Sequence, residues 1–400
     1  MKKIIFIFIG IFSIISCTND ILEINDANVS PTKGINNVNK ITETNALNIA
    51  SKIFNKTRSV SDYTIEYVLN DNPKTRNINI PDTLAYIINF GNNNGFAVIS
   101  SDNRIFPILA YSDTGHFKYE KSENDPVYVN FISIIDDYMA TINENDTAII
   151  IPDDYFSTCV VKAPQLETRY WAQWAPFNKY IAEEYPGSPV GCVGIAAGQI
   201  IASLKDEFTF HDSIFNFKAI KEAMDTAKFH INPYPQQRIG QNVTKYSYET
   251  AVDKVARFLY FLCKDLNMKF YPDESPAQSV NAFYLLKKLG FYIEEQNYLT
   301  SYFSDEKIIE SLEQKNLIYV DGRVIGNNIA GHAWVIDGYS YCGTDPITNK
   351  KQYVKFHCDW GWGGTDNGYY SSDLFNTTFG NFENMKYFSV RNQKVIIVEQ

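Results

Sequence analysis

Short apolar runs rich in β-forming residues mark the first part of the chain. They predict three strands, at 83–90, 96–100 and 107–112. Residues 92–95 are Asn-Asn-Asn-Gly, which tolerate the positive φ of a tight turn, so a hairpin is expected between the first two strands. Apolar stretches at 46–54 and 127–139 favour helices.

Longer helical patterns begin after residue 190 and are followed by β-like runs. The expected helices are 190–205, 252–266, 280–289 and 308–312. The expected strands are 317–320, 333–339, 352–356, 368–371 and 388–390. Asp321-Gly322 is expected to turn the chain after the first of these strands. Helices first and strands later indicate an α+β domain, and a loop-like composition places a domain boundary between 150 and 165.

The segment 190–205 is apolar almost all the way round, which is typical of a helix buried in a core. Its first turn carries Cys192, flanked by Gly191 and Gly194. A thiol at a helix N-terminus lies at the positive end of the helix dipole, which lowers the pKa of the thiol. A small buried thiol without chemistry is the alternative that this segment alone leaves open.

Composition limits the possible partners. The chain has 400 residues, 45% of them hydrophobic, and a formal net charge of −10. This length allows two domains after a leader is removed. A negative charge argues against nucleic acid or an anionic membrane surface as the main partner.

The N-terminus indicates export. Met1-Lys2-Lys3 is basic, the stretch 4–15 is apolar but too short to span a bilayer, and Ser16-Cys17 follows. Residues 14–17 resemble a bacterial lipobox, in which Cys17 would be acylated, whereas ordinary cleavage and release is the competing interpretation. We expect residues 1–17 to be a leader, and membrane contact only through a lipid on Cys17.

The cysteine spacing suggests neither a disulfide scaffold nor a zinc site. The six cysteines are Cys17, Cys159, Cys192, Cys263, Cys342 and Cys358. Without Cys17 their number is odd, so at least one is free or pairs between molecules, and with Cys192 free three pairings of the others stay open. His357-Cys358-Asp359 hints at a metal, but neighbouring strand residues point to opposite faces. We therefore expect no metal and no cofactor.

Four residues together suggest nucleophilic catalysis. His332 follows Cys192 within the range of about 130–150 residues typical of papain-type thiol proteases. Asp359 lies far enough beyond His332 for a strand, a turn and a returning strand to bring it beside the histidine. Gln173 precedes the cysteine, where its amide could donate to an oxyanion, and Trp360 could shield the His–Asp hydrogen bond from water. Each residue alone has a structural explanation, and only the joint arrangement predicts a thiolate nucleophile, a base and an orienting group.

Residues from about 163 to 392 resemble the streptopain family of bacterial papain-like cysteine peptidases. The matching motifs are Trp171-Ala172-Gln173, Gly191-Cys192-Val193 with Gln199, Gly331-His332-Ala333-Trp334-Val335-Ile336-Asp337-Gly338 and Trp360-Gly361-Trp362-Gly363-Gly364. Asn94-Gly95-Phe96-Ala97-Val98-Ile99-Ser100 and Pro107-Ile108-Leu109-Ala110-Tyr111-Ser112 are similar to the inhibitory prodomain of that family.

The resemblance implies a papain-like α+β fold preceded by a small α+β prodomain, and synthesis as a zymogen. Carried over to this chain, the resemblance implies Cys192 as the nucleophile and His332 as the base. It also implies Gln173 as the oxyanion donor and Trp360 as the shield. Ser275 and Gly331 would border the substrate cleft. Asp359 stands where the family commonly has Asn. An anionic partner would raise the pKa of His332 and so extend the ion pair to higher pH.

We therefore predict a leader at 1–17, an inhibitory prodomain at 18–160 and a catalytic domain at 161–400. The chain is expected to leave a bacterial cell as a secreted or lipid-anchored zymogen of a cysteine endopeptidase, which acts on proteins or peptides. Cleavage within 153–167, with Lys162 as one candidate position, would remove the prodomain that inhibits it. The alternatives are a transglutaminase-like acyltransferase and a catalytically silent binding protein.

Overall fold

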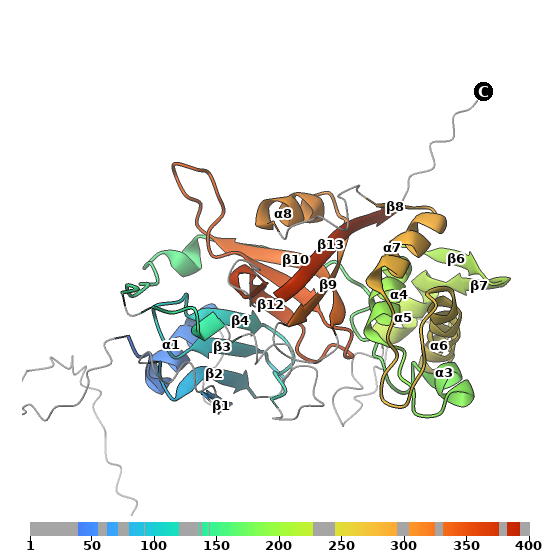
Figure 1. Ribbon diagram of the computed structural model, residues 1–400, viewed down its shortest axis with the longest axis horizontal. Coiled ribbons are helices and arrows are strands. Elements are labelled where there is room, and N and C mark those ends of the chain that lie inside the picture. Colours follow the sequence, from blue (N-terminus) through green and yellow to red (C-terminus); the bar gives the residue numbers. More distant parts are fainter. Residues whose placement is uncertain are drawn as a thin grey trace, which may run out of the picture. The chain divides into compact units, whose positions relative to one another are not determined.

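The computed structural model (Figure 1) describes most of the chain from residue 39 onward. The described residues are 39–54, 62–70, 80–91, 93–119, 135, 138–143, 145–226, 245–293, 304–324, 331–375 and 382–392. The expected leader with Cys17, and most of the helix expected at 127–139, lie outside them.

A small antiparallel sheet with one helix forms the N-terminal part. Its elements are α1 (Glu43–Ile53), β1 (Tyr63–Leu69), β2 (Thr83–Phe90), β3 (Phe96–Ser100) and β4 (Ile108–Ser112). Helix α1 begins after Thr42, whose hydroxyl accepts a hydrogen bond from the Asn45 backbone N–H at 3.3 Å. Its buried Ala46 and Ala50 allow it to lie close to β2 and β3. The expected β2–β3 hairpin is confirmed.

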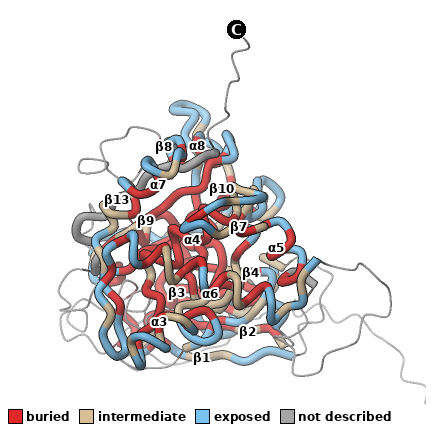
Figure 2. The backbone as a smooth tube through the Cα atoms, turned by 90° about the vertical axis from the view of Figure 1, so that its right-hand side faces the viewer, coloured by how far each residue is buried: buried red, intermediate tan, exposed pale blue. Residues whose placement is uncertain are grey.

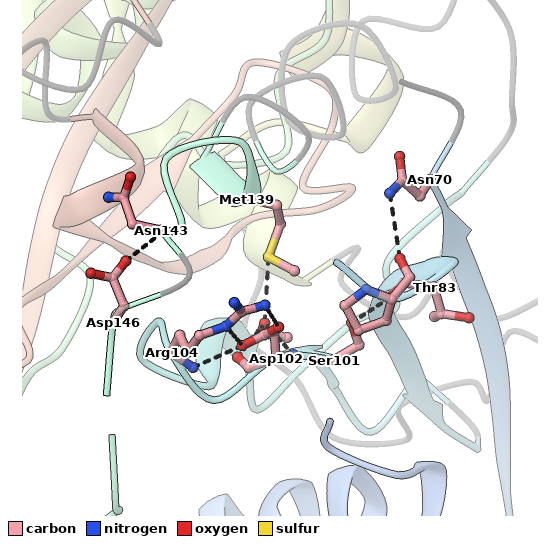
Figure 3. Close-up of polar contacts among 10 residues, drawn as sticks. Asn70, Thr83, Ser101, Asp102, Arg104, Met139, Asn143 and Asp146 are labelled. Atoms are coloured by element: carbon pink, nitrogen blue, oxygen red, sulfur yellow. Dashed lines mark hydrogen bonds and ion pairs between the residues drawn. The ribbon is translucent and has the colours of Figure 1, made fainter. Parts of the chain in front are cut away.

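A buried ion pair fixes the connection between β3 and β4. Arg104 Nη2 lies 2.6 Å from Asp102 Oδ2, and the backbone N–H and Nε of Arg104 both donate to Asp102 Oδ1 at 2.9 Å (Figure 3). Both side chains are almost fully buried. A buried charge needs such a paired and hydrogen-bonded partner, so this turn has a defined conformation.

The C-terminal part contains the remaining described helices, with α4 in its main hydrophobic core and α8 packed on β9 and β10. The helices are α3 (Lys179–Glu184), α4 (Cys192–Leu204), α5 (Phe217–Thr226), α6 (Tyr248–Asp265), α7 (Ser279–Lys288) and α8 (Asp305–Glu313), with short 3-10 turns at Tyr155–Ser157 and Ser372–Phe375. Ten consecutive residues of α4, from Val193 to Ala202, are buried, and Figure 2 shows α4 mostly red. The helix lies against α6, α7 and the strands β9 and β10, as expected for an apolar helix.

The C-terminal strands continue the N-terminal sheet. They are β5 (Cys159–Lys162), β8 (Phe291–Ile293), β9 (Leu317–Val324), β10 (His332–Cys342), β11 (Lys355–Asp359), β12 (Gly368–Ser371) and β13 (Phe382–Asn392). The sheet order is β1-β2-β3-β4-β12-β11-β10-β9-β13-β8, with β5 beside β10 (Figure 1). Strands β6 (Glu207–Phe210) and β7 (Ser213–Asn216) form a separate hairpin. The two parts are joined by an antiparallel β4–β12 pair, with Tyr111 opposite Tyr369.

The segment around the expected domain boundary is bound to the C-terminal part. Strand β5 pairs with the end of β10, and a disulfide joins Cys159 to Cys342. Cys192, Cys263 and Cys358 are free thiols. Of the pairings left open by the sequence, a single bridge forms.

Some local expectations were wrong. Asp321-Gly322 does not turn the chain, because β9 continues to Val324 and Gly322 pairs with His332 of β10. Pairing with a neighbouring strand here overrides the local preference of Asp-Gly for turns. Strand β11 begins at Lys355, three residues later than expected. Within the part of the chain that the structure describes, none of the helices has the length and apolarity needed to cross a bilayer.

Candidate active site

The backbone before Cys192 has a conformation that favours glycine. Gly191 has φ 84°, and a Cβ there would lie 2.4 Å from the backbone oxygen of Ser275. This close approach places the N-terminus of α4 against the loop that carries Ser275. The Val190 backbone N–H donates to Gln173 O at 2.7 Å. Val190 lies two residues before Cys192, so this bond holds the Gln173 backbone near the start of α4.

Two opposing influences act on the Cys192 thiol. Burial raises its pKa, whereas the backbone N–H groups of Ala333, Val193 and Cys192 lower it. The net pKa lies above the usual value, so the lowering expected from the helix N-terminus is outweighed. The Ala333 N–H belongs to β10, and its contact with the sulfur brings the start of that strand onto the nucleophile.

His332 is the first residue of β10 and is buried. Its Nε2 lies 3.0 Å from the carbonyl oxygen of Trp360. Because a carbonyl only accepts, Nε2 carries the hydrogen, and Nδ1 is the nitrogen left to take up a proton. The Trp362 ring stacks on the imidazole with centroids 5.0 Å apart, and the Trp360 ring is tilted at 6.2 Å.

Burial also determines the charge of His332. It lowers the pKa of the imidazole to about 4, and the hydrogen bond to Trp360 O opposes this only in part. Thiol and imidazole are therefore both neutral near pH 7 in this form of the chain. The expectation of a raised His332 pKa was wrong, because no carboxylate takes part in orienting the ring.

Asp359 has other partners than the one expected. Its Oδ1 accepts from Gln199 Nε2 and from the Gly361 backbone N–H, each at 3.0 Å, and its Oδ2 accepts from Asn367 Nδ2 at 2.8 Å. His332 Nε2 donates its hydrogen bond not to Asp359, as expected, but to the carbonyl oxygen of the following residue, Trp360.

The loop motifs of the sequence meet in one place. Ala172 forms an isolated β-bridge with Trp362, and the Gly363 backbone N–H donates to Trp171 O at 3.0 Å. The loop before α4 is thus fastened to the loop that orients His332. Gln173, in the first of these loops, is partly exposed.

The remaining candidates lie near the site in different roles. Ser275 is buried, and its hydroxyl donates to Pro189 O at 2.7 Å, so it supports the chain before Cys192. Gly331 is exposed and precedes His332. His357 Nδ1 lies 2.6 Å from Asp337 Oδ1. Among the described residues, no group of His, Cys, Asp and Glu could hold a metal ion.

Three side-chain contacts at the site were not predicted from the sequence. Trp362 and Gln199 lie in matching motifs, but the motifs do not show that Trp362 stacks on His332 or that Gln199 donates to Asp359. Asn367, which also donates to Asp359, has no sequence surroundings that distinguish a buried amide from one on the surface.

A cavity of about 1100 Å³ lies where the N-terminal sheet meets the C-terminal part. Residues of both parts line it, among them Tyr111, Cys159, Arg169, His357 and Tyr369. Cys192 and His332 are not among its lining residues. The cavity is therefore separate from Cys192 and His332.

Comparison with known proteins agrees with this geometry. Residues 171–370 match the model of the peptidase C10 family, and residues 38–138 match that of the Spi protease inhibitor. A streptopain from Streptococcus pyogenes serotype M28 is 26% identical over 318 residues, which cover 70% of this chain and 72% of the relative. The thiol protease/hemagglutinin PrtT of Porphyromonas gingivalis is 23% identical over 74% of this chain but only 34% of its own length.

A solved structure shows the same fold. A prointerpain A fragment of Prevotella intermedia superposes with a TM-score of 0.51 at 20% identity, covering 78% of this chain and 96% of that fragment. The expected papain-like α+β fold with a preceding prodomain is thereby confirmed. With its family match covering half of the sequence, the chain belongs to the peptidase C10 family and is a cysteine endopeptidase that carries an inhibitor domain.

Proposed function

We propose that this chain is exported as a zymogen and that Cys192 and His332 hydrolyse peptide bonds after the N-terminal domain is removed. The observation that carries the proposal is the contact between the Ala333 N–H and the Cys192 sulfur. It brings the start of β10, where His332 lies, to the N-terminus of α4. This supports the assignment of Cys192 as the nucleophile and His332 as the base, two residues from distant parts of the chain.

The proposed reaction begins with transfer of the Cys192 proton to Nδ1 of His332. The thiolate attacks the carbonyl carbon of the scissile peptide, and a C–S bond forms. The negative charge on the carbonyl oxygen is met by the backbone N–H of Cys192 and the side-chain amide of Gln173. One such donor contributes roughly 2.7–4 kcal/mol to stabilising the transition state.

Breakdown of this intermediate releases the first product. The C–N bond breaks as the imidazolium gives its proton to the leaving amine. His332 then takes a proton from water, which attacks the thioester, and the carboxylic acid leaves as the thiol is restored. In this proposal the Trp360 carbonyl accepts a hydrogen bond from Nε2 throughout, which leaves Nδ1 free to exchange protons with the thiol.

Latency follows from the neutral catalytic pair. Burial raises the pKa of the Cys192 thiol and lowers that of His332, so the thiolate is disfavoured in the zymogen. The N-terminal domain contributes to this state by binding near the orienting loop: the Lys118 backbone N–H donates to Asp366 Oδ1 at 2.7 Å. Its removal exposes the loop to water and lowers the cost of charge separation.

The proposed location is outside the cytoplasm. The basic, apolar and Ser16-Cys17 pattern of the leader supports export, and acylation of Cys17 would leave the enzyme tethered to a membrane. Incorporation of a labelled fatty acid by the full chain in a bacterial host tests this. Loss of the label in Cys17→Ala supports the anchor, and an unlabelled wild type contradicts it.

The catalytic proposal is tested with residues 18–400, wild type beside Cys192→Ala. The masses of both are followed over time, with casein as substrate and iodoacetamide as inhibitor. We expect the wild type to shorten to a fragment that begins near residue 160, to degrade casein and to stop when alkylated. The variant is expected to stay at full length.

If neither protein shortens, an external protease is used to remove the N-terminal domain from both. A correctly trimmed wild type that still cleaves no protein or peptide would contradict the proposal. The comparisons give no support to the acyltransferase or binding alternatives.

A further inference from the structure

Asp359 lies at the end of β11, between the helix that carries Cys192 and the loop that orients His332. It is fully buried, and no Lys or Arg side chain is among the groups that hydrogen-bond to its carboxyl. Its three partners are all N–H donors, from Gln199 of α4, from Gly361 and from Asn367. Because all its partners are donors, this buried carboxyl group forms the best hydrogen bonds when it is ionised and acts only as an acceptor.

The network continues from Asn367 to the backbone of Trp360. Asn367 Nδ2 donates to Asp359, so its Oδ1 is turned the other way and accepts from the Trp360 N–H at 3.1 Å. The carbonyl of this same Trp360 receives the hydrogen bond of His332. Both polar backbone groups of Trp360 are thus fixed, one by the network and one by the catalytic ring.

The hydrogen bonds of this network have a single possible direction. If residue 359 were an amide, one of its two polar atoms would be an NH₂ group facing a donor. If that NH₂ group pointed toward Asn367, the Asn367 amide would have to rotate, and its own NH₂ group would then face the Trp360 N–H. If the NH₂ group pointed the other way, it would face two donors, Gln199 Nε2 and the Gly361 N–H, and the backbone N–H cannot rotate away.

We propose that Asp359 and Asn367 are positioning residues that hold the Trp360 carbonyl, and through it the His332 ring, in the geometry for proton transfer with Cys192. Neither residue touches the imidazole. Gln199 extends the same network to α4, because its Nε2 donates to both Asp359 and Thr168 O. The nucleophile helix and the base are therefore positioned by one carboxylate.

The charge state of Asp359 gives the proposal a pH signature. Burial, and to a smaller extent the negative Asp337, raises the pKa of Asp359 to about 7, while the hydrogen bonds from Gln199 and Gly361 and the nearby His357 oppose this in part. As pH falls below this value, the carboxyl takes up a proton and no longer accepts from all three donors. The turnover number should therefore decrease on the acidic side, in addition to any effect of the catalytic pair.

The test uses residues 18–400 carrying Asp359→Asn, Asn367→Asp or both, each trimmed by the same external protease. This inference rests on the proposed function, and kcat, KM and their pH dependence are measured on one peptide substrate. Each single variant is expected to lose roughly 10- to 100-fold in kcat with little change in KM, since the ring is misplaced and not the substrate.

The double variant is expected to recover most of the lost kcat. An amide at 359 accepts from Gln199 and the Gly361 N–H and donates to a carboxylate at 367, which accepts from the Trp360 N–H. Every hydrogen bond is then restored, and the acidic limb of the pH profile shifts because the charge has moved. A purely structural role would not predict recovery from two changes that each disrupt the network.

Asp305→Asn is the control, because it changes a partly buried carboxyl outside this network. Its Oδ2 accepts a hydrogen bond from Ser372 Oγ at 2.8 Å. It should leave kcat unchanged. Single variants with the wild-type kcat and pH profile would overturn the inference, as would a double variant that is folded but no better than either single one. A trimmed wild type without activity would instead contradict the proposed function.

Discussion

Cys192 and His332 form a pair whose charges depend on how much water reaches them. The structure gives the histidine a carbonyl partner, which fixes the tautomer without stabilising a full positive charge as a carboxylate would. Charge separation between thiol and imidazole is thus left to the moment when substrate and solvent enter the site. The folded structure thus sets the orientation of the His332 ring but does not stabilise its charged form.

The lowered pKa of His332 makes the stability of the zymogen depend on pH. The unfolded chain takes up a proton on this histidine near pH 6.5 and the folded chain only near pH 4. The free energy of unfolding therefore decreases by about 3 kcal/mol as pH falls through that range. Asp359 acts in the opposite direction: its raised pKa stabilises the folded state at low pH, and this is lost as pH rises toward 7.

Denaturant unfolding of Cys192→Ala, with and without His332→Ala, separates the two contributions. The free energy of unfolding of the parent should fall more steeply between pH 6.5 and 4 than that of the double variant, by about 3 kcal/mol. His116→Ala, which changes an exposed histidine, serves as the control and should retain the slope of the parent. Equal slopes in all three would contradict the buried, neutral His332.

At the residue scale, the sequence predicted the type of chemistry more accurately than it predicted which atoms are in contact. Cys192, His332 and Gln173 could be proposed as site residues because their residue types and motifs are typical of thiol protease chemistry. Asp359 was assigned the wrong partner, because spacing along the chain shows that two strands return side by side but not which atom faces the imidazole. The directional network through Asn367 depends on side-chain geometry that no periodicity encodes.

At the scale of elements, the sheet shared by the two parts is the main feature. The strands at 83–90 and 96–100 and the apolar helix after residue 190 were predictable, since each has a strong local pattern. The β4–β12 pair was not predictable, because the partners are far apart in the sequence and neither strand shows which edge it will meet. Long-range pairing of this kind is set by the tertiary fold.

Gly368 allows this pairing. A Cβ at this position would lie 2.7 Å from Tyr111 O, 3.0 Å from Phe96 Cζ and 3.2 Å from Ser112 Cβ, all in the N-terminal part. Gly368→Ala should therefore weaken the β4–β12 contact by about 1–3 kcal/mol. We expect a lower melting temperature of the full chain and faster self-cleavage, with the wild-type kcat/KM after trimming.

Gly198→Ala is the matched control for this prediction. Its new Cβ would lie 2.7 Å from Leu259 Cδ2, a contact confined to α4 and α6. This variant should lower the melting temperature before and after trimming, whereas Gly368→Ala should do so only before. A Gly368→Ala zymogen as stable and as slow to mature as the wild type would show that the β4–β12 pair does not hold the inhibitor domain.

At the scale of the whole molecule, residues that belong to different expected domains are buried together. Lys355 of β11 is almost fully buried, and its Nζ lies 3.1 Å from the Tyr155 hydroxyl and 5.0 Å from the centroid of the Phe106 ring. Burial lowers its pKa to about 7. Removal of the N-terminal part is therefore expected to expose this amine to water and to raise its pKa.

The Cys159–Cys342 bridge has a consequence for how the chain can be divided. Together with the backbone between its two cysteines, it closes a covalent macrocycle that contains Cys192 and His332. Residues before 159 form a tail outside the macrocycle. A single cut in the tail produces two molecules, whereas a single cut inside the macrocycle opens it and still leaves one molecule.

The position of the maturation cut therefore determines whether cleavage alone frees the inhibitor. After a cut between 153 and 158, alkylated products should separate on a gel without reductant, and β5 should stay with the enzyme. After a cut following Lys162, they should migrate as one species until a dithiol reduces the bridge. Separation without reductant after a mapped cut beyond Cys159 would contradict the bridge. Cleavage just before Cys159 therefore releases the N-terminal fragment, whereas cleavage just after Cys159 leaves that fragment covalently attached through the disulfide.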